Sequence, residues 1–130
     1  MSNDTKTAKE FDVTQALVDL EGDAVTLVNG RVQKYEATIA RPEFAELDLA
    51  PLTLRSSFVT ALLQAERDIS AEEGLSRHML AQKIYKQDKV SLTAEQIVLL
   101  KKLMPKAYNT PLLLGQVIDI LDPAAKEKIS

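Results

Sequence analysis

Histidine and serine are the residues of this sequence that could act as a base and a nucleophile, and their spacing indicates no catalytic site. His78 is the only histidine and there is no cysteine, so neither a His–Cys pair nor a usual zinc site can form. Ser56, Ser57 and Ser91 have no base nearby in the sequence, and we interpret them as cap and surface residues. We therefore expect a protein that is not an enzyme and that uses no cofactor or metal.

Acidic residues gather in two groups, and neither predicts a metal site. Residues 19–23, DLEGD, superficially resemble a calcium-binding loop. The glycine stands at the wrong loop position and no bidentate glutamate follows at the required offset, so we interpret the segment as a turn. The second group is mostly explained by the preference of acids for first turns of helices, with an acidic surface for a basic partner as the alternative. Its members are Glu43, Glu46, Asp48, Glu66, Asp68, Glu72 and Glu73.

The main basic concentration lies across two consecutive expected helices. Its members are Lys83, Lys86, Lys89, Lys101, Lys102 and Lys106. This arrangement raises a helix-turn-helix as an alternative, in which the lysines would contact nucleic acid. The recognition helix would read EQIVLLKKLM, which is too apolar and lacks the Arg, Asn and Gln array that contacts base edges. Nucleic-acid binding is therefore the less favoured interpretation.

Composition and charge are those of one globular domain. The 130 residues are 45% hydrophobic and 27% charged, with a net charge of −3. A chain of this length can bury a core of its own. The acidic balance argues against non-specific nucleic-acid binding. The first ten residues contain no apolar signal region, and the absence of cysteine is consistent with a reducing cytoplasm.

The stretch that must organise the fold is residues 92–121, which predicts two helices joined at residues 108–110. Thr93 and Gln96 have the spacing of a capping box, so the first helix begins after Thr93. Pro105 lacks an amide hydrogen and its ring crowds the preceding turn. We therefore expect this helix to end or kink at the proline.

The second of these helices begins at Thr110-Pro111 and stops at Asp122-Pro123. Only Gln116 and Asp119 interrupt its apolar residues, so we expect it to be buried on most of its circumference. Gly115 inside a helix costs about 1 kcal/mol relative to alanine, and we expect another backbone to approach it closely. The helix is too short to span a membrane.

Two further helices are expected before this stretch. One is capped by Thr53 and runs to about Ala65, and the next begins with the capping-box pair Ser70 and Glu73 and runs to about Tyr85. Helical spacing predicts four inward-facing residues on the latter helix. They are Leu75, Met79, Leu80 and Ile84. Residues 87–90 are expected as a linker.

The N-terminal third is expected to be rich in β-structure. Asn29-Gly30 between residues 24–28 and 31–39 predicts a hairpin, with Tyr35, Ala37 and Ile39 on one face. Residues 11–20 leave strand and short helix open, and residues 41–51 predict an irregular connector or a short edge strand.

The expected strands all come before the expected helices along the chain. This order predicts a mostly helical α+β fold, with an N-terminal β-hairpin region followed by a compact core of four helices. Residues 1–10 are expected as a disordered tail. Residues 11–122 form a single globular domain, β-rich over 11–50 and helical over 51–122, and residues 123–130 form a frayed tail.

Residues 52–121 resemble a group of small, mostly uncharacterised proteins encoded by tailed bacteriophages and prophages. Three blocks carry the resemblance: PLTLRSSFVTALL (51–63), HMLAQKIYK (78–86) and LTAEQIVLLKKLMPKAYNTPLLLGQVIDIL (92–121). In that group a turn with an L-D-G pattern precedes the first block, and we take residues 19–22 as its counterpart. The group usually has glycine where this chain has Pro105. The resemblance implies a protein of the bacterial cytoplasm and transfers no catalytic residue.

We therefore expect a phage-encoded protein that works through contacts with a phage structural protein or a host protein, as an assembly factor or a modulator. Leu112, Leu113 and Leu114 mark the expected contact surface, because a run of this kind exceeds what a small core needs. The alternative is that Phe58, Met79 and the hairpin cover this run. A second copy of the chain is a further candidate partner. Alternative functions are a tail-assembly chaperone and a small DNA-binding regulator.

Overall fold

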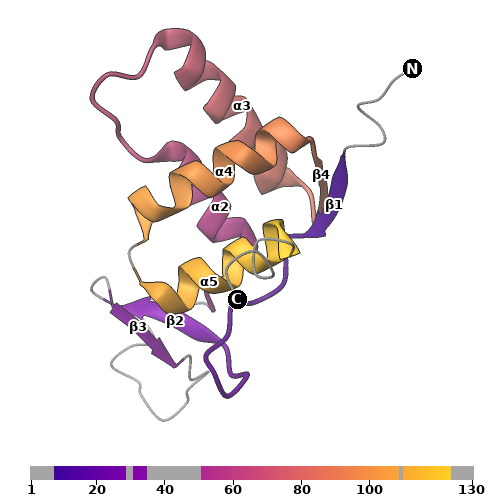
Figure 1. The fold of residues 1–130 in the computed structure, drawn as a ribbon, viewed down its shortest axis with the longest axis vertical. Coiled ribbons are helices and arrows are strands. Elements are labelled where there is room, and N and C mark those ends of the chain that lie inside the picture. The colour runs from indigo at the N-terminus through magenta and orange to yellow at the C-terminus, as the bar shows by residue number, and fades with distance from the viewer. Residues whose placement is uncertain (1–7, 29–30, 35–50, 109, 124–130) are drawn as a thin grey trace.

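The computed structural model describes residues 8–28, 31–34, 51–108 and 110–123. Within these residues the chain forms four short strands and four helices (Figure 1). In chain order they are β1 (Lys9–Asp12), β2 (Val25–Val28), β3 (Arg31–Lys34), α2 (Leu54–Leu63), α3 (Ala71–Lys86), β4 (Lys89–Leu92), α4 (Ala94–Ala107) and α5 (Pro111–Leu121). The expected class, mostly helical α+β with β-structure before the helices, is confirmed.

The strands form two separate two-stranded antiparallel sheets, β1–β4 and β2–β3. In the second sheet Val25 lies opposite Lys34 and Val28 lies opposite Arg31, which confirms the two strands of the expected hairpin. The predicted turn residues Asn29 and Gly30 lie outside the described residues. So do the expected shared face of Tyr35, Ala37 and Ile39, and all of the connector up to Pro51.

The β1–β4 sheet corrects two expectations. Lys9 and Glu10 were expected in a disordered tail and residues 87–90 in a linker, but β1 pairs with β4 with Lys9 opposite Leu92. Phe11 of β1 and Val90 and Leu92 of β4 face the core, while the other residues of these two strands are exposed. Alternation over only four residues is too short to stand out in a sequence, although it is enough to fix the register once one face is buried.

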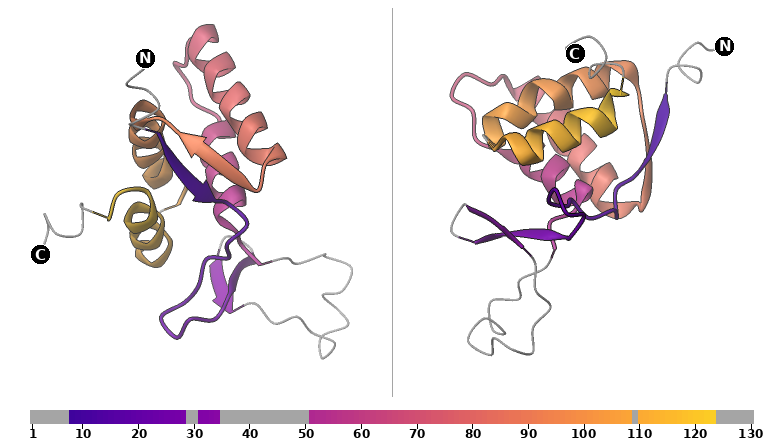
Figure 2. Two further views of the ribbon diagram at one scale, coloured as in Figure 1. Left: turned by 90° about the vertical axis from the view of Figure 1, so that its right-hand side faces the viewer. Right: turned by 60° about the horizontal axis from the view of Figure 1, so that its bottom comes forward.

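The N-terminal segment packs directly on the helices. The Leu17 amide donates to the Leu52 carbonyl at 2.8 Å, and the Leu52 amide donates to the Val25 carbonyl at 2.7 Å. On α5 the Gln116 side chain donates to the Val18 carbonyl and accepts from the Val18 amide, both at 2.7 Å. The side-chain amide thus pairs with Val18 as a neighbouring strand would. Figure 2 shows the segment passing along α2 and α5.

The helix starts follow their predicted caps. Thr53 and Thr93 each accept from the third backbone amide of their helix. Their own backbone amides donate to the side chains of Ser56 and Gln96 respectively, which completes a capping box at each helix. Ser70 accepts from the Glu73 amide. α2 ends at Leu63, slightly before the expected Ala65.

Pro105 neither ends nor visibly interrupts α4, which corrects the expectation of a break. The helix continues to Ala107, and the Tyr108 amide donates to the Met104 carbonyl at 2.8 Å. A proline in the last turn removes one hydrogen bond near an end where few bonds remain to lose, so the turn survives. α5 then begins at Pro111 after Thr110, whose side chain makes no cap hydrogen bond.

The inward faces of α3 and α5 differ from the predicted ones. On α3 Leu75 and Met79 are 60% and 59% exposed, while Arg77 is only 4% exposed. On α5 the buried residues are confined to a single stripe, and Gly115 is exposed with nothing within 4 Å of where a Cβ would lie. The expected close approach of another backbone at Gly115 is therefore wrong for the described residues.

One hydrophobic core joins both ends of the described chain. Phe58, fully buried on α2, is the largest of its completely buried side chains. The other buried apolar residues are Phe11, Val13, Leu17, Val25, Leu52, Leu54, Ala61, Leu62, Leu80, Ala81, Ile84, Val90, Leu92, Ile97, Leu100, Leu103, Met104, Tyr108, Leu113, Val117 and Leu121. Because this core draws on the strands and on every described helix, the described part of the N-terminal third contributes directly to stability.

Candidate functional site

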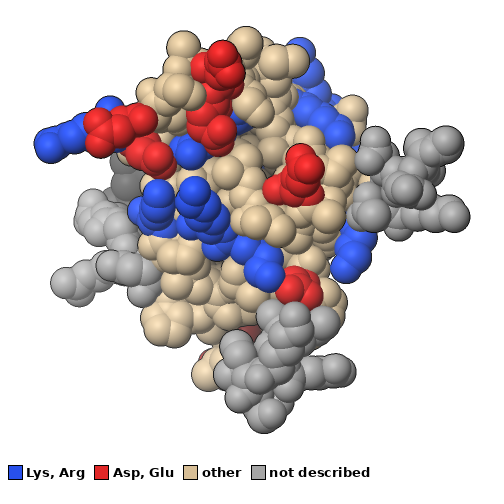
Figure 3. Space-filling model, turned by 45° about the horizontal axis from the view of Figure 1, so that its top comes forward, with Lys and Arg blue, Asp and Glu red and all other residues tan. Residues whose placement is uncertain are grey.

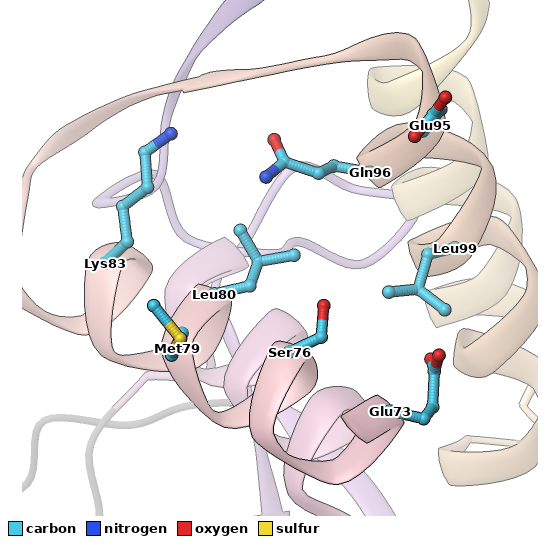
Figure 4. A pocket seen from close by; sticks show the side chains of 8 residues that line it. All are labelled: Glu73, Ser76, Met79, Leu80, Lys83, Glu95, Gln96 and Leu99. Atoms are coloured by element: carbon cyan, nitrogen blue, oxygen red, sulfur yellow. The ribbon is translucent and has the colours of Figure 1, made fainter. Parts of the chain in front are cut away.

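A groove lies between α3 and the first turns of α4 in the described part of the chain. It has a volume of about 390 Å³. Figure 4 shows its lining side chains, five from α3 and three from α4. They are Glu73, Ser76, Met79, Leu80, Lys83, Glu95, Gln96 and Leu99. Three of these residues, Met79, Leu80 and Leu99, are apolar, and the other five are polar or charged.

The apolar part of the groove continues onto exposed surface. Leu80 is buried at the groove and Leu99 is half-buried, whereas Met79 beside them is 59% exposed. Leu75, one helical turn before Met79, and Val98, next to Leu99 in the sequence, are also exposed but do not line the groove. Singly scattered apolar residues are normal on a protein surface, whereas Met79 is exposed at a groove.

Three charged side chains stand around the groove. Figure 4 shows Lys83 and Glu73 toward opposite ends of the α3 wall, and Glu95 on α4. Glu73 is neutralised by Arg77, whose Nε donates to it at 2.9 Å. Glu95, exposed in the first turn of α4, makes no ion pair with any described residue. The groove therefore carries one cation, Lys83, and one carboxylate, Glu95, that is not balanced by a described residue.

Local hydrogen bonds hold the two walls of the groove in place. Lys83 Nζ donates to the Ser91 carbonyl of β4 at 2.8 Å and so ties α3 to the strand that leads into α4. Arg55 of α2 donates to the carbonyls of Ile84 and Gln87 at the C-terminal end of α3, at 3.3 and 2.7 Å. A cation at this end of a helix also complements its dipole.

A second polar cluster fixes the N-terminal part of α3. Buried Arg77 donates to Glu73 on its own helix and, at 3.1 Å, to Glu66, which precedes α3. Lys106 Nζ of α4 lies 3.5 Å from the carboxylate of Glu66. Burial alone would lower the pKa of Arg77, but its hydrogen bonds to Glu73 and Glu66 raise it. The hydrogen bond from Arg77 in turn lowers the pKa of Glu66. The cluster therefore stays charged at neutral pH and links α3 to α4.

The expected contact surface at residues 112–114 is largely part of the fold. Leu113 is 1% exposed and belongs to the core. Leu114 is half-buried and packs against that core, and Leu112 is also half-buried. Leu113 therefore cannot contact a partner without unfolding, and only the flanks of the run reach the surface.

The six lysines lie on three elements and do not form a helix-turn-helix, because β4 runs between α3 and α4. Lys101 pairs with Asp122 at 2.7 Å, and Lys106 is engaged by Glu66 as described above. Lys86, Lys89 and Lys102 are exposed. On the face shown in Figure 3, basic and acidic groups are interspersed rather than segregated.

The turn at residues 19–23 brings Asp19, Glu21 and Asp23 together, with one carboxylate oxygen of each within 4.8 Å of the others. Asp19 Oδ1 accepts the amides of Glu21 and Asp23, and Gly22 has a φ of 89°. Lys34 forms a 3.0 Å ion pair with Asp23. These bonds describe the turn that the sequence predicts, with a lysine balancing its charge.

The serines and the histidine that could do chemistry have structural surroundings. Ser56 belongs to the α2 capping box, and buried Ser57 donates to the Leu54 carbonyl. His78 is exposed on α3.

Among the described helices, none has the length and apolar character that a bilayer span requires. Comparison of the chain with protein-family models, with curated proteins and with solved structures finds no match.

Proposed function

We propose that this chain works through protein contacts rather than catalysis, and that the groove between α3 and α4 is its partner-binding surface. The observation that supports this most is the exposure of Met79 at the groove, where a surface helix normally carries polar residues. A groove of about 390 Å³ between two helices has room for apolar side chains of a partner segment, with a polar rim to orient them.

The setting of this activity follows from the resemblance to proteins of tailed bacteriophages and prophages. The partner would be a phage structural protein, which makes the chain an assembly factor, or a host protein, which makes it a modulator. Both act in the cytoplasm of the bacterial host. In either case the partner contributes apolar side chains that contact Met79, Leu80 and Leu99, together with polar groups that match the rest of the groove lining.

The test is capture of a partner by tagged protein from phage-infected or prophage-induced cells, read by mass spectrometry at moderate salt. Wild type is compared with Met79→Glu, which places a charge at the groove, and with Leu63→Glu. Leu63 is 53% exposed on α2 and does not line the groove, so this control alters an apolar surface residue by the same chemistry.

We expect one protein to be recovered in near-stoichiometric amount by wild type and Leu63→Glu, and at least about 10-fold less by Met79→Glu, the effect of truncating one well-placed interface anchor. A virion protein would indicate an assembly role, including tail-assembly chaperoning, and a host protein would indicate modulation. Equal recovery by Met79→Glu would reject the groove. Recovery of nucleic acid alone, released by salt, would reject protein contact as the function.

A further inference from the structure

We infer that the groove binds a partner segment with an aspartate or glutamate side chain, whose carboxylate is bound by Lys83 and Gln96 beside an apolar side chain that contacts Leu80. This inference rests on the proposed function and names the chemistry of the partner that the same groove takes. Two donor groups with unused capacity stand where β4 leads into α4, and they determine this chemistry.

Lys83 is the cation of the groove lining, and it is held in place without being neutralised. Its Nζ donates to the Ser91 carbonyl of β4 at 2.8 Å. An ammonium group has three donors, so two remain. Among the described residues no carboxylate forms an ion pair with Lys83. The half-buried lysine therefore presents a positive charge and unused donors to a segment that enters the groove.

The capping box of α4 fixes the orientation of the Gln96 amide group. Gln96 Oε1 accepts from the Thr93 amide at 2.9 Å, so the oxygen is the end turned toward the start of the helix. The amide group cannot be turned over, because its nitrogen cannot accept that hydrogen bond. Gln96 Nε2 is the other end, and it makes no hydrogen bond with a described residue. Gln96 therefore offers two donors from the α4 wall of the groove.

These donors converge from the two walls of the groove. Lys83 and Gln96 bond to Ser91 and Thr93, whose positions two residues apart keep these anchors within roughly 7 Å of each other. Figure 4 shows Gln96 extending from α4 toward Leu80 and Lys83 on α3. A carboxylate has two oxygens, so one can accept from the ammonium group and the other from the amide. Such charge-assisted hydrogen bonds are stronger than neutral ones, which favours a carboxylate over a backbone carbonyl.

The apolar part of the lining lies beside these donors. Leu80, Leu99 and the exposed Met79 line the same groove. An apolar side chain next to the partner's acid would contact them, and methionine adapts to irregular shapes because it is unbranched and polarisable. A volume of about 390 Å³ accommodates a few side chains, so the partner contributes a short segment to the groove.

Glu95 is the other charge of the lining that no described residue balances. It is exposed, and charges in such positions contribute little to binding because water screens them. It repels the partner's carboxylate weakly, so removing its charge should strengthen binding. The alternative is a basic segment held by Glu95, which predicts the opposite effects of substitutions at Glu95 and Gln96.

The experiment is selection of short random peptides, displayed on yeast, by the purified full chain, followed by fluorescence anisotropy with the synthesised peptides. We expect the selected peptides to share an aspartate or glutamate beside a large apolar residue. Gln96→Glu keeps the capping-box acceptor but replaces the donors by a negative charge, so it should weaken binding at least about 10-fold. Glu95→Gln, at the neighbouring residue, should strengthen binding about 2-fold.

Matched variants test each contact. Lys83→Met should weaken binding at least about 10-fold, because a charge-assisted hydrogen bond is lost. Lys102→Met makes the same change at an exposed lysine of α4 outside the groove and should bind as wild type does. Changing the peptide's acid to the matching amide should remove most of the difference between wild type and Gln96→Glu. Circular dichroism checks that each variant folds, and Gln96→Glu carries the test if Lys83→Met does not.

The inference is overturned if no peptide is selected, if the selected peptides share no carboxylate, or if folded Gln96→Glu binds them as wild type does. Basic peptides whose binding is weakened by Glu95→Gln and strengthened by Gln96→Glu would also overturn it. These outcomes are separate from those of the proposed function. Capture from cells that depends on Met79 but not on Lys83 or Gln96 would reject the carboxylate and leave partner binding standing. Acidic peptides bound as expected, without any protein captured from cells, would do the reverse.

Discussion

The side-chain amide of Gln116 makes a prediction that follows directly from the geometry. It forms two 2.7 Å hydrogen bonds with the backbone of Val18, which lies 98 residues away in sequence. Replacing it by Gln116→Leu keeps the volume of the side chain but removes both bonds. Each such bond contributes about 1 kcal/mol, and leaving half-buried amide groups unpaired adds up to about 1 kcal/mol. The free energy of unfolding should fall by about 2–3 kcal/mol.

The assay is urea unfolding followed by circular dichroism, with thermal unfolding as a second measure. For a domain of this size 1 kcal/mol corresponds to about 3–5 °C, so the melting temperature should fall by roughly 6–15 °C. Asp119→Leu is the control, because Asp119 is exposed on the same helix and its change should be within about 0.5 kcal/mol. A loss at Gln116 no larger than this control would refute the pairing of α5 with the N-terminal segment.

A second substitution separates hydrogen bonding from packing. Gln116→Glu keeps an acceptor for the Val18 amide, but its ionised form cannot donate to the Val18 carbonyl. Folding should therefore raise the pKa of the introduced carboxyl. Its protonated form restores the donor, so the variant should lie closest to wild type below pH about 4.3 and lose stability as pH rises. A deficit independent of pH would mean that the loss is one of packing alone.

Three further substitutions test other parts of the fold by the same unfolding assay. Gly115→Ala should stabilise the protein by about 0.5–1 kcal/mol, because a Cβ there meets nothing within 4 Å; destabilisation would show that a close neighbour exists. Leu100→Ala should cost about 2–5 kcal/mol because Leu100 is fully buried, while Val98→Ala, at a residue 63% exposed, should be nearly neutral. The hydrogen bond from Arg77 lowers the pKa of Glu66 from its ordinary 4.5, so its contribution is complete above about pH 4.5 and disappears as pH falls through the lowered value. Glu66→Gln should flatten the pH dependence of stability in this acid range, and an unchanged profile would contradict the ion pair.

The helix starts could be predicted because capping is local chemistry. Thr53, Ser70 and Thr93 each stand three residues before their bonding partner, and all three caps are present. The hairpin strands were also predictable, since Asn-Gly between β-rich runs is a strong local signal. Pro105 shows the limit of a local rule. The rule describes a helix interior, whereas α4 ends two residues after the proline.

The β1–β4 sheet could not be found in this way. Its strands are four residues long, and their partners lie about 80 positions apart, so no local window contains the pairing. The same holds for the bond between Gln116 and Val18. Long-range contacts of this kind depend on how the helices pack, and a polar residue in an apolar helix signals only that some partner is needed.

The groove depends on which residues of α3 are buried and which are exposed, and apolar periodicity alone did not predict this correctly. Leu75 and Met79 were expected inside, whereas both are exposed and Arg77 is buried. The missed signal was Glu73, four residues before Arg77 and able to pair with it on the same face. With Glu66 as a second partner, the guanidinium can be buried at acceptable cost.

This pattern of burial has a consequence for the surface. Burying the Arg77 face turns the opposite side of α3, which carries Leu75 and Met79, toward solvent, and Met79 lines the groove. Had stability alone shaped this helix, the simpler solution would place these apolar side chains inside, where each stabilises by about 1.5–3 kcal/mol, and leave the arginine hydrated. Departures of this kind from simple packing are expected at functional sites. The Arg77 cluster thus holds α3 in the orientation that exposes Met79 at the groove, and Arg77→Met should weaken partner capture in the mass-spectrometry assay even where the chain still folds.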